Sequence, residues 1–161
     1  MAKLDPETEN NIEELIRAAE AGNAAAQTHL GWCYDEGDGV EVDHEKAFYW
    51  YTRSAEAGNA TGQFNLAMCY ELGTGTKIDC KKAFYWYEKS AEQGDADAQY
   101  NLGLCYESNR LKDKTEAIKW YRKSAEQGYA PAQCSLGNHY WTGKGINKNF
   151  EQAVLWYRKA A

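Results

Sequence analysis

A repeat of 36 residues, shortened to 34 in one copy, constrains this 161-residue chain more than any other feature. A Trp-Tyr pair recurs four times, and glycine, glutamine, leucine and tyrosine recur in step with it. A unit of this length cannot bury its apolar face alone, so neighbouring units must stack on one another. The recurring residues are Trp50-Tyr51, Trp86-Tyr87, Trp120-Tyr121 and Trp156-Tyr157; Gly22, Gly58, Gly94 and Gly128; Gln27, Gln63, Gln99 and Gln133; Leu30, Leu66, Leu102 and Leu136; and Tyr34, Tyr70, Tyr106 and Tyr140.

Each repeat divides into two predicted helices. The first runs from about Ala24 to Glu36 in the first copy, begins after an Asn or Asp cap and ends at a glycine suited to a left-handed cap. The second begins after another Asp or Asn cap and ends at the glycine that opens the next repeat. Pro131 falls in the first turn of a helix, where proline is tolerated. The expected caps are Asn23, Asn59 and Asp95; Gly37, Gly73 and Gly143; and Asp43, Asp79, Asp113 and Asn149.

The pattern therefore predicts an all-α fold, an α-solenoid of antiparallel helix pairs in a single repeat domain over residues 1–161. An N-terminal capping helix is expected over residues 5–21, with Asp5 as its cap and the more polar Glu14-Leu15 in place of the Trp-Tyr pair. The third repeat has ESNRLKDK where its siblings have a glycine loop. The repeats are expected at residues 23–58, 59–94, 95–128 and 129–161.

The strings AQTHLGWCYDEGDG and DHEKAFYWYTRSAEAG, with their later copies, resemble the Sel-one-like repeat (SLR), a relative of the tetratricopeptide repeat. The resemblance covers about residues 18–161. It implies a right-handed superhelix with a concave face that serves as an adaptor for protein complexes. Two departures are Ala67, which stands where the other copies have a helix glycine, and the missing glycine loop of the third repeat.

The aromatic run of the second helix, KAFYWY in two copies, is predicted to be mostly core. On a helical wheel Phe48, Trp50 and Tyr51 share one face and Tyr49 lies opposite. The copies of Phe48 are always apolar, whereas the position of Tyr49 also accepts lysine, as a solvent position does. The run therefore interlocks the repeats, and Tyr49 and Tyr85 form a secondary convex patch where a partner could bind.

The first helix of each repeat carries the expected binding groove. Ala26, Leu30, Cys33 and Tyr34 form its buried stripe, while the opposite face varies between copies and holds large apolar residues. By resemblance to tetratricopeptide repeats, that face lines the concave groove. The candidate groove residues are Thr28, His29, Trp32, Asp35, Phe64, Asn65, Met68, Glu71, Tyr100, Asn101, Leu104, Glu107, Asn138 and Trp141.

An apolar stripe on a solvent-facing side of a helix marks an interaction surface. The groove is expected to bind an extended or helical peptide, or a partner domain, through aromatic anchors, with Asn65 and Asn101 offering both donors and acceptors to a peptide backbone. Asp35, Glu71 and Glu107 would attract a basic segment. In the competing interpretation, some of these side chains merely fill the inside curve of the superhelix.

No catalytic or metal-binding pattern appears in the sequence. Cys33, Cys69 and Cys105 hold one repeat position, so they should lie about 10 Å apart, too far for disulfides. His29, His44 and His139 belong to no ligand-spaced cluster, and no nucleophile has a plausible base. An enzyme is not expected, and neither is a cofactor or a metal. A hydrolase using the same groove and a purely structural spacer are the alternative functions. Cys134 is expected to be exposed.

The net charge of −6 and the lack of a basic cluster argue against nucleic acid as a partner. No apolar run approaches the ~18 residues of a membrane span, and no signal peptide is visible. Together with unpaired cysteines, this predicts a cytoplasmic protein that binds proteins or peptides with apolar and basic residues. The last helix pair, ending in RKAA, lacks a polar cap. It is expected to belong to a longer array or to support self-association.

Overall fold

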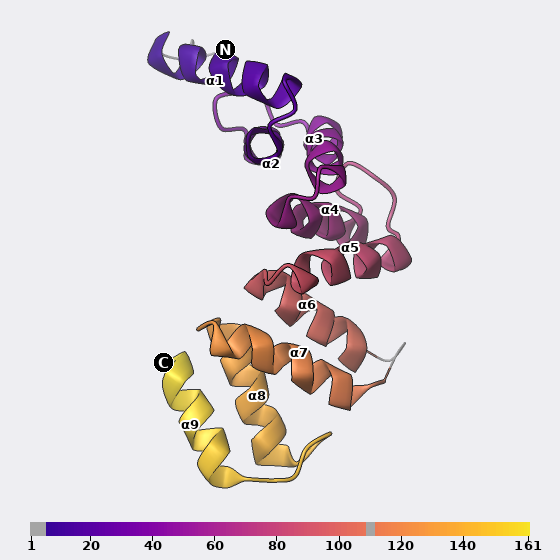
Figure 1. Cartoon of the computed structure of the whole chain (residues 1–161), viewed down its shortest axis with the longest axis vertical. Coiled ribbons are helices and arrows are strands. Elements are labelled where there is room, and N and C mark those ends of the chain that lie inside the picture. Colours follow the sequence, from indigo (N-terminus) through magenta and orange to yellow (C-terminus); the bar gives the residue numbers. More distant parts are fainter. Residues whose placement is uncertain (1–5, 109–111) are drawn as a thin grey trace. The chain divides into compact units, whose positions relative to one another are not determined.

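A computed structural model describes the backbone of residues 6–108 and 112–161, and it confirms the predicted all-α solenoid (Figure 1). Throughout these residues, all regular structure is helical. Short loops join the helices in antiparallel pairs. The helices are α1 (Pro6–Glu20), α2 (Ala24–Glu36), α3 (His44–Glu56), α4 (Ala60–Leu72), α5 (Cys80–Glu92), α6 (Ala96–Glu107), α7 (Lys114–Glu126), α8 (Ala130–Thr142) and α9 (Phe150–Ala160).

The predicted caps set the helix boundaries. Asn23 Oδ1 accepts a hydrogen bond from the Ala26 amide at the start of α2, and Asp43 caps α3 in the same way. These side chains satisfy amides that have no partner within the helix. Gly37 ends α2 with a φ of 78°, a left-handed conformation that costs glycine nothing. Asp5, the expected cap of α1, lies outside the described residues.

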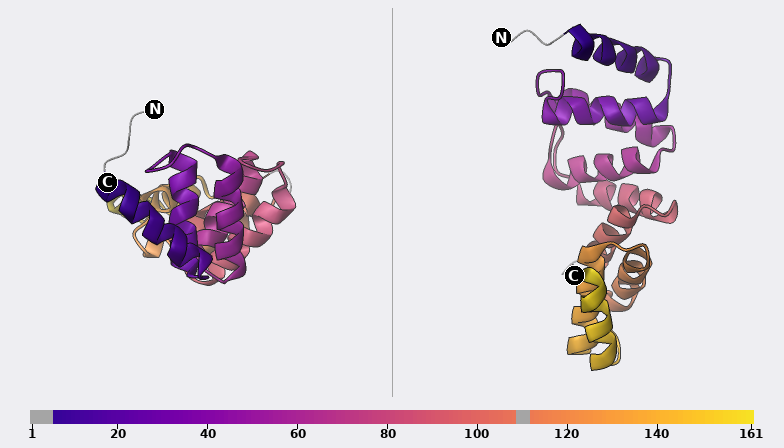
Figure 2. Two further views of the ribbon diagram at one scale, coloured as in Figure 1. Left: turned by 90° about the horizontal axis from the view of Figure 1, so that it is seen from above. Right: turned by 90° about the vertical axis from the view of Figure 1, so that its left-hand side faces the viewer.

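The chain forms two compact units, residues 1–86 (unit 1) and 87–161 (unit 2), and the division falls within α5. In unit 1, α1 packs on α2, α2 on α3 and α4, and α3 on α4 (Figures 1 and 2). In unit 2, α6 packs on α7, α7 on α8, and α8 on α9. In both units, each helix pair therefore rests on the next pair, as stacking of repeats requires.

Buried glutamines explain why that residue recurs with the period. Gln63 Nε2 donates to the Ala55 carbonyl at 3.2 Å, which joins α4 to the end of α3. Gln133 makes the same bond to the Ala125 carbonyl, at 3.0 Å, in unit 2. A carbonyl in the last turn of a helix has no partner within that helix, so each glutamine satisfies a backbone group and ties two repeats together.

In the aromatic run, the second tyrosine is buried and the first is exposed, as predicted, whereas Phe48 and Trp50 are half-buried. Tyr51 and Tyr121 are buried in the cores of units 1 and 2, whereas Tyr49 and Tyr85 are each 49% exposed. The buried rings lie against helix glycines. A Cβ added to Gly31 would stand 2.7 Å from the Tyr51 ring, and the corresponding glycines of α6 and α8 are equally crowded by their own tyrosines. The recurring glycine therefore makes room for the recurring tyrosine.

Candidate groove on the first helices of the repeats

Three pockets occur at one position of the repeat, between the first helix of a repeat and the repeat before it. The α1–α2 pocket has a volume of about 430 Å³, the α2–α4 pocket about 120 Å³ and the α6–α8 pocket about 250 Å³. Equivalent residues line all three: His29, Asn65 and Ser135; Cys33, Cys69 and His139; and Asp38, Thr74 and Lys144. The first two pockets lie in unit 1 and the third lies in unit 2. We call the side of the first helices that carries these pockets the groove face.

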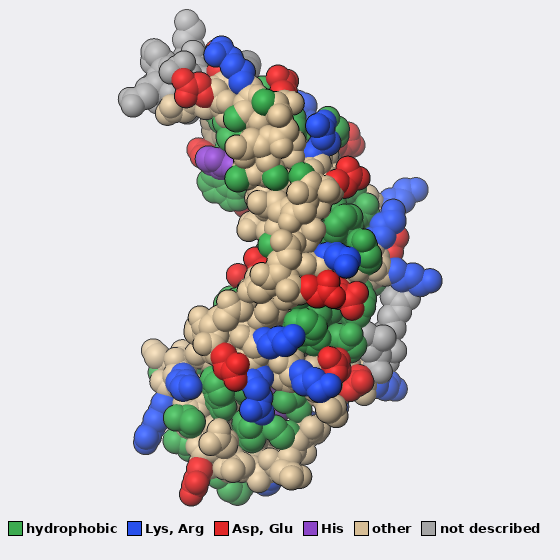
Figure 3. Space-filling model, viewed as in Figure 1, with side chains coloured by type: hydrophobic (Ala, Val, Ile, Leu, Met, Phe, Trp, Pro, Cys, Tyr) green, Lys and Arg blue, Asp and Glu red, His purple; other side chains and the backbone are tan. Residues whose placement is uncertain are grey.

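None of the first helices of the repeats contains lysine or arginine, and α2, α4 and α6 carry acidic residues, although Lys144 of the loop after α8 lines the α6–α8 pocket. Every Lys and Arg of the chain lies outside α2, α4, α6 and α8. A surface that holds charges of one sign attracts ligands of the opposite sign and steers their approach. Elsewhere the charges are mixed, with basic and acidic side chains interspersed on the face drawn in Figure 3. The acidic residues of the four helices are Asp35, Glu36, Glu71, Asp97 and Glu107.

The α2–α4 pocket combines apolar walls with one carboxylate. Phe64, Met68 and Leu72 of α4 line it, and Asp35 of α2 stands at its edge. The Asp35 Oδ1 atom accepts a hydrogen bond from His44 Nδ1 at 2.8 Å. Leu72 is 61% exposed and was not among the predicted site residues, although it follows Met68 by one helical turn on the same face.

Buried polar atoms beneath the α2–α4 pocket do not supply reactivity. Cys69 lines it, but burial raises the pKa of this thiol to about 12. The thiol therefore stays protonated at neutral pH and is a poor nucleophile. Burial also raises the pKa of the Tyr51 hydroxyl, with Asp35 contributing. Both groups act as neutral packing atoms of the pocket.

The α6–α8 pocket is polar, because His139 stands where the preceding repeats have cysteine. His139 is only 5% exposed, and its Nδ1 atom donates to the Lys144 carbonyl at 2.7 Å. Its Nε2 atom lies 3.5 Å from Glu107 Oε2, which also accepts a hydrogen bond of 2.9 Å from the Tyr121 hydroxyl. The sequence prediction assigned His139 to no cluster. The sequence did contain a signal for it: His139 occupies the repeat position that holds cysteine in the other three copies (Cys33, Cys69 and Cys105).

Several predicted groove residues do lie exposed on these helices. Trp32 is 43% exposed and Leu104 is 42% exposed. Trp141 is 51% exposed and its ring packs edge-on against Phe150, with centroids 4.9 Å apart. His29 lines the α1–α2 pocket, where its ring lies 6.0 Å from that of Trp32. Glu71 is also exposed, and Phe64, Asn65, Met68 and Glu107 are half-buried in pocket walls.

Two of the predicted groove residues, Thr28 and Tyr100, pack against neighbouring helices instead of facing solvent. The Thr28 hydroxyl lies 2.6 Å from that of Ser54 and 3.1 Å from Asn59 Oδ1, so it joins α2 to the end of α3 and the start of α4. Tyr100 is half-buried, with its ring 5.6 Å from Tyr121. Helical periodicity placed both on the outer face, but neighbouring helices cover them.

Two asparagine side chains of the groove face already make hydrogen bonds within the protein. Asn101 Nδ2 donates to the Asp97 carbonyl of its own helix at 3.1 Å. Asn138 is exposed, and its Oδ1 atom accepts a 2.7 Å hydrogen bond from the Tyr157 hydroxyl. Asn65 lines the α2–α4 pocket. Of the two asparagines predicted to bind a peptide backbone, Asn65 is thus the one that lines a pocket.

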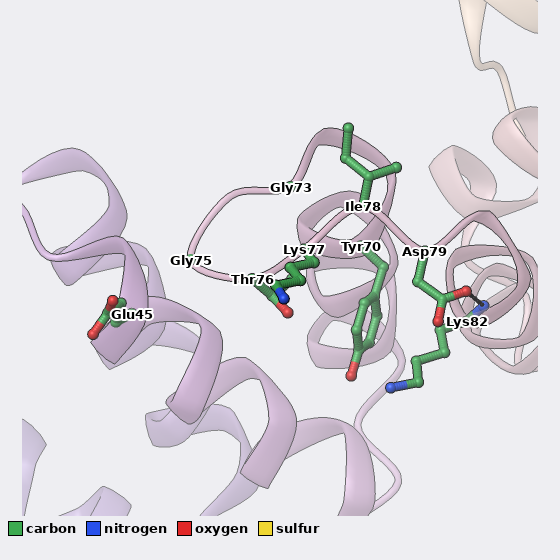
Figure 4. A pocket seen from close by; sticks show the side chains of 9 residues that line it. All are labelled: Glu45, Tyr70, Gly73, Gly75, Thr76, Lys77, Ile78, Asp79 and Lys82. Carbon is green, nitrogen blue, oxygen red and sulfur yellow. Dashed lines mark hydrogen bonds between the residues drawn. The ribbon is translucent and has the colours of Figure 1, made fainter.

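A further depression lies away from the groove face. It measures about 860 Å³ and is formed by the loop between α4 and α5 together with Glu45, Tyr70 and Lys82 (Figure 4). Lys82 Nζ lies 5.0 Å from the centre of the Tyr70 ring, a cation–π contact. Figure 4 shows Glu45 on the far side of the depression from this pair, so the lining side chains do not converge.

The described residues also bear on metal binding, membrane spans and the cysteines. Among the side chains that the structure describes, no group of three His, Cys, Asp or Glu could hold a metal ion. No helix of this part of the chain is long and apolar enough to cross a membrane. Cys33 and Cys69 are buried, while Cys134 is exposed as predicted.

Comparisons with known proteins agree with the repeat pattern. The family model of the Sel1 repeat matches residues 24–59, 60–95, 96–129 and 130–161. A protective antigen of uropathogenic Escherichia coli that displays an SLR fold is 40% identical, with a TM-score of 0.86, over 92% of this chain and 32% of that chain. A Sel1 repeat protein from Oxalobacter formigenes is 34% identical, with a TM-score of 0.89, over 96% of this chain and 64% of that chain.

More distant structures share the fold alone. An immunity protein from Pseudomonas aeruginosa is 22% identical, with a TM-score of 0.62, over 99% of this chain and 67% of that chain. No match was found among curated proteins. The chain spans less than two thirds of the length of the E. coli and O. formigenes proteins. With four matched repeats covering most of its residues, the chain belongs to the Sel1 repeat family.

Proposed function

We propose that this protein is a non-enzymatic adaptor whose groove face binds a peptide or a partner domain with apolar and basic residues. Sel1 repeat proteins generally mediate protein–protein interactions. The observation that carries the proposal is the recurrence of a pocket at one repeat position, on first helices of the repeats that contain no lysine or arginine.

The exposed side chains on this face suit a protein ligand. Trp32, Trp141 and Leu104 are exposed, and large apolar side chains of this kind dominate the energetics of protein interfaces. The carboxylates of Asp35 and Glu71 supply a negative field for a basic partner. A purely structural spacer would have no need of exposed tryptophans on the same helices as the pockets.

The test measures binding of a synthetic fluorescent peptide that alternates lysine with leucine, beside a peptide that has glutamate in place of lysine. We expect the lysine peptide to bind more tightly and its binding to weaken as salt is raised. Phe64→Ala combined with Met68→Ala should reduce its affinity at least about tenfold, because the two side chains form the walls of the α2–α4 pocket.

The matched control is Tyr49→Ala combined with Tyr85→Ala on the secondary patch, which removes two exposed aromatics of similar size. We expect this variant to bind the lysine peptide as the wild type does. Unchanged affinity in the Phe64 and Met68 variant, with folding confirmed by circular dichroism, would refute the groove. A loss confined to the tyrosine variant would move the binding site to the secondary patch.

Self-association through the last helix pair remains a further proposal. Val154 is 42% exposed, whereas the equivalent Ile118 is 5% exposed within the core of unit 2. Phe150 and Leu155, also on α9, are 50% and 44% exposed. Sedimentation at several concentrations tests it, and Val154→Lys should shift any dimer to monomer.

Cytoplasmic location is likewise proposed, and fractionation of the source cells tests it.

A further inference from the structure

We propose that the α2–α4 pocket is a subsite for one cationic side chain, a lysine or arginine of the partner, and that the α6–α8 pocket is its internally blocked counterpart. This inference rests on the proposed function and names the chemistry that one part of the groove would recognise. It follows from a comparison of two pockets that occupy the same repeat position within separate units.

The α2–α4 pocket matches both parts of a lysine or arginine side chain. Such side chains bury their aliphatic stems against apolar atoms and keep the charged head in a polar environment. Phe64, Met68 and Leu72 offer apolar walls, and Asp35 and Asn65 offer oxygen acceptors. The volume of about 120 Å³ equals that of about four water molecules. No lysine or arginine lines this pocket, so the carboxylate has no cation of its own chain beside it there.

The contact with His44 leaves acceptor positions of the Asp35 carboxylate open. A carboxylate can only accept, so His44 Nδ1 donates its proton in the 2.8 Å hydrogen bond. The Asp35 side chain is 30% exposed and the His44 side chain is 51% exposed. A carboxylate has about four acceptor positions, so an incoming ammonium group can share Asp35 with His44.

The α6–α8 pocket holds the same carboxylate position, but its own chain already surrounds it. Glu107 Oε2 accepts from the Tyr121 hydroxyl and lies 3.5 Å from His139. Lys144 lines this pocket where Thr74 lines the other, so a lysine of the chain already borders this space. The apolar walls are also absent, because Asn138 and Thr142 replace Met68 and Leu72. A second cation would find neither an open carboxylate nor a surface for its stem.

The test needs no natural partner. The probe is Nα-acetyl-lysine methylamide, and its control is Nα-acetyl-norleucine methylamide, which keeps the stem and lacks the ammonium group. Backbone amide shifts of the ¹⁵N-labelled full chain are followed by NMR during titration at constant ionic strength. We expect saturable, millimolar shifts at Asn65, Met68 and Cys69 with the lysine probe, and weaker binding of the norleucine probe. Residues Ser135, Asn138 and Thr142 should not respond.

Three variants sharpen the result. Asp35→Asn should weaken the lysine probe about fivefold and leave the norleucine probe unchanged, as expected for loss of one partly exposed ion pair. Thr74→Lys should have a similar effect, because it installs the internal cation of the other pocket. Lys144→Thr, His139→Cys, Asn138→Met and Thr142→Leu combined should make Ser135 respond to the lysine probe, because together they introduce the corresponding side chains of the α2–α4 pocket. A thermal melt of each variant confirms that it is folded.

Equal shifts with both probes, or an unchanged affinity in folded Asp35→Asn, would overturn the cationic subsite. So would equal wild-type responses at the two pockets. These outcomes are distinct from failure of the proposed function, because the alternating lysine peptide can bind the groove through its leucines. Conversely, a lysine probe that binds as expected while that peptide fails would keep the subsite and refute the adaptor proposal.

Discussion

The α2–α4 pocket of unit 1 and the α6–α8 pocket of unit 2 occupy the same place in the repeat and differ in almost every lining side chain. One has Phe64, Met68 and Cys69 where the other has Cys134, Asn138 and His139. The backbone around both is held by the same buried glutamine contact. Because the repeat scaffold is maintained by other residues, the pocket residues are free to differ, and each pocket can acquire its own chemistry.

The difference also shows how one buried position changes a pocket. Cys69 is a small neutral side chain whose thiol stays protonated, so Asp35 interacts with His44 at the surface. His139, at the equivalent place, needs a polar partner because it is buried; its Nδ1 atom donates to the Lys144 carbonyl, and its Nε2 atom lies 3.5 Å from Glu107. Replacing cysteine with His139 at this repeat position therefore brings a polar ring next to Glu107, which also accepts the hydrogen bond of Tyr121.

The largest expected effect concerns the loops that carry Thr74 and Lys144. Gly75 has a φ of 66°, and an added Cβ would collide with the His44 carbonyl oxygen. We expect Gly75→Ala to lower the free energy of unfolding by about 3 kcal/mol, combining backbone strain with a clash against backbone. Gly145→Ala should cost less, because its Cβ would meet the Lys114 Cβ at 2.7 Å, a less severe overlap than that of Gly75 with the His44 backbone. Urea denaturation measures both; equal costs would show that the two loops are packed alike.

The buried Cys69 and the exposed Cys134 should differ in thiol reactivity. Because the pKa of Cys69 is about 12, its thiolate fraction at pH 8 is minute. We expect Cys134, which is exposed, to react with a disulfide reagent at least about 100-fold faster than Cys69. The test follows modification of each cysteine by mass spectrometry of peptides. In His139→Cys the new thiol should be as slow as Cys69, and a fast reaction there would show that the α6–α8 pocket is open to its floor.

The tyrosines beneath the two pockets provide the next comparison. Removing the Tyr121 hydroxyl deletes a hydrogen bond to the Glu107 carboxylate, so Tyr121→Phe should cost about 1.5 kcal/mol of unfolding free energy. Tyr51→Phe should cost less than half as much, because Asp35 is bonded to His44 instead. Thermal and urea unfolding of both variants test this. If Tyr51→Phe costs as much as Tyr121→Phe, the two carboxylates are held in the same way.

The smallest expected effect is at the helix caps, where α4 begins with Asn59 and α6 with Asp95. Burial raises the pKa of Asp95, although the Ala98 amide it accepts from opposes this. The folded state therefore holds the proton more tightly than the unfolded state, and the ionised carboxyl costs stability at neutral pH. Asp95→Asn keeps the cap and should raise stability at pH 7 by less than about 1 kcal/mol.

The pH dependence of that gain provides its check. As the pH falls through the raised pKa of Asp95, the wild-type carboxyl becomes protonated and its cost disappears. The melting temperature of Asp95→Asn should therefore exceed that of the wild type most at neutral pH, and the difference should shrink in acid. A difference that grows on acidification would contradict the direction of the pKa shift.

Much of the fold was predictable from the sequence, because the repeat shows each helix boundary several times. Caps such as Asn23 and Asp43 act within three residues, so local pattern was sufficient to place them. The periodicity of the aromatic run separated the buried Tyr51 from the exposed Tyr49 for the same reason. The helices expected to carry the groove were chosen from the variation of their outer face between copies, and binding there stays a prediction.

The sequence by itself determined the repeat, the helices and the face on which a partner is expected, because these depend on contacts repeated along the chain. Only the tertiary structure decided which of those residues meet. Thr28 and Tyr100 read as outer positions, yet neighbouring helices engage them. Glu107, Tyr121 and His139 converge from three helices, and a spacing of 14 or 18 residues gives no sign of it. Periodicity reports the face of one helix, whereas a pocket depends on how several helices pack.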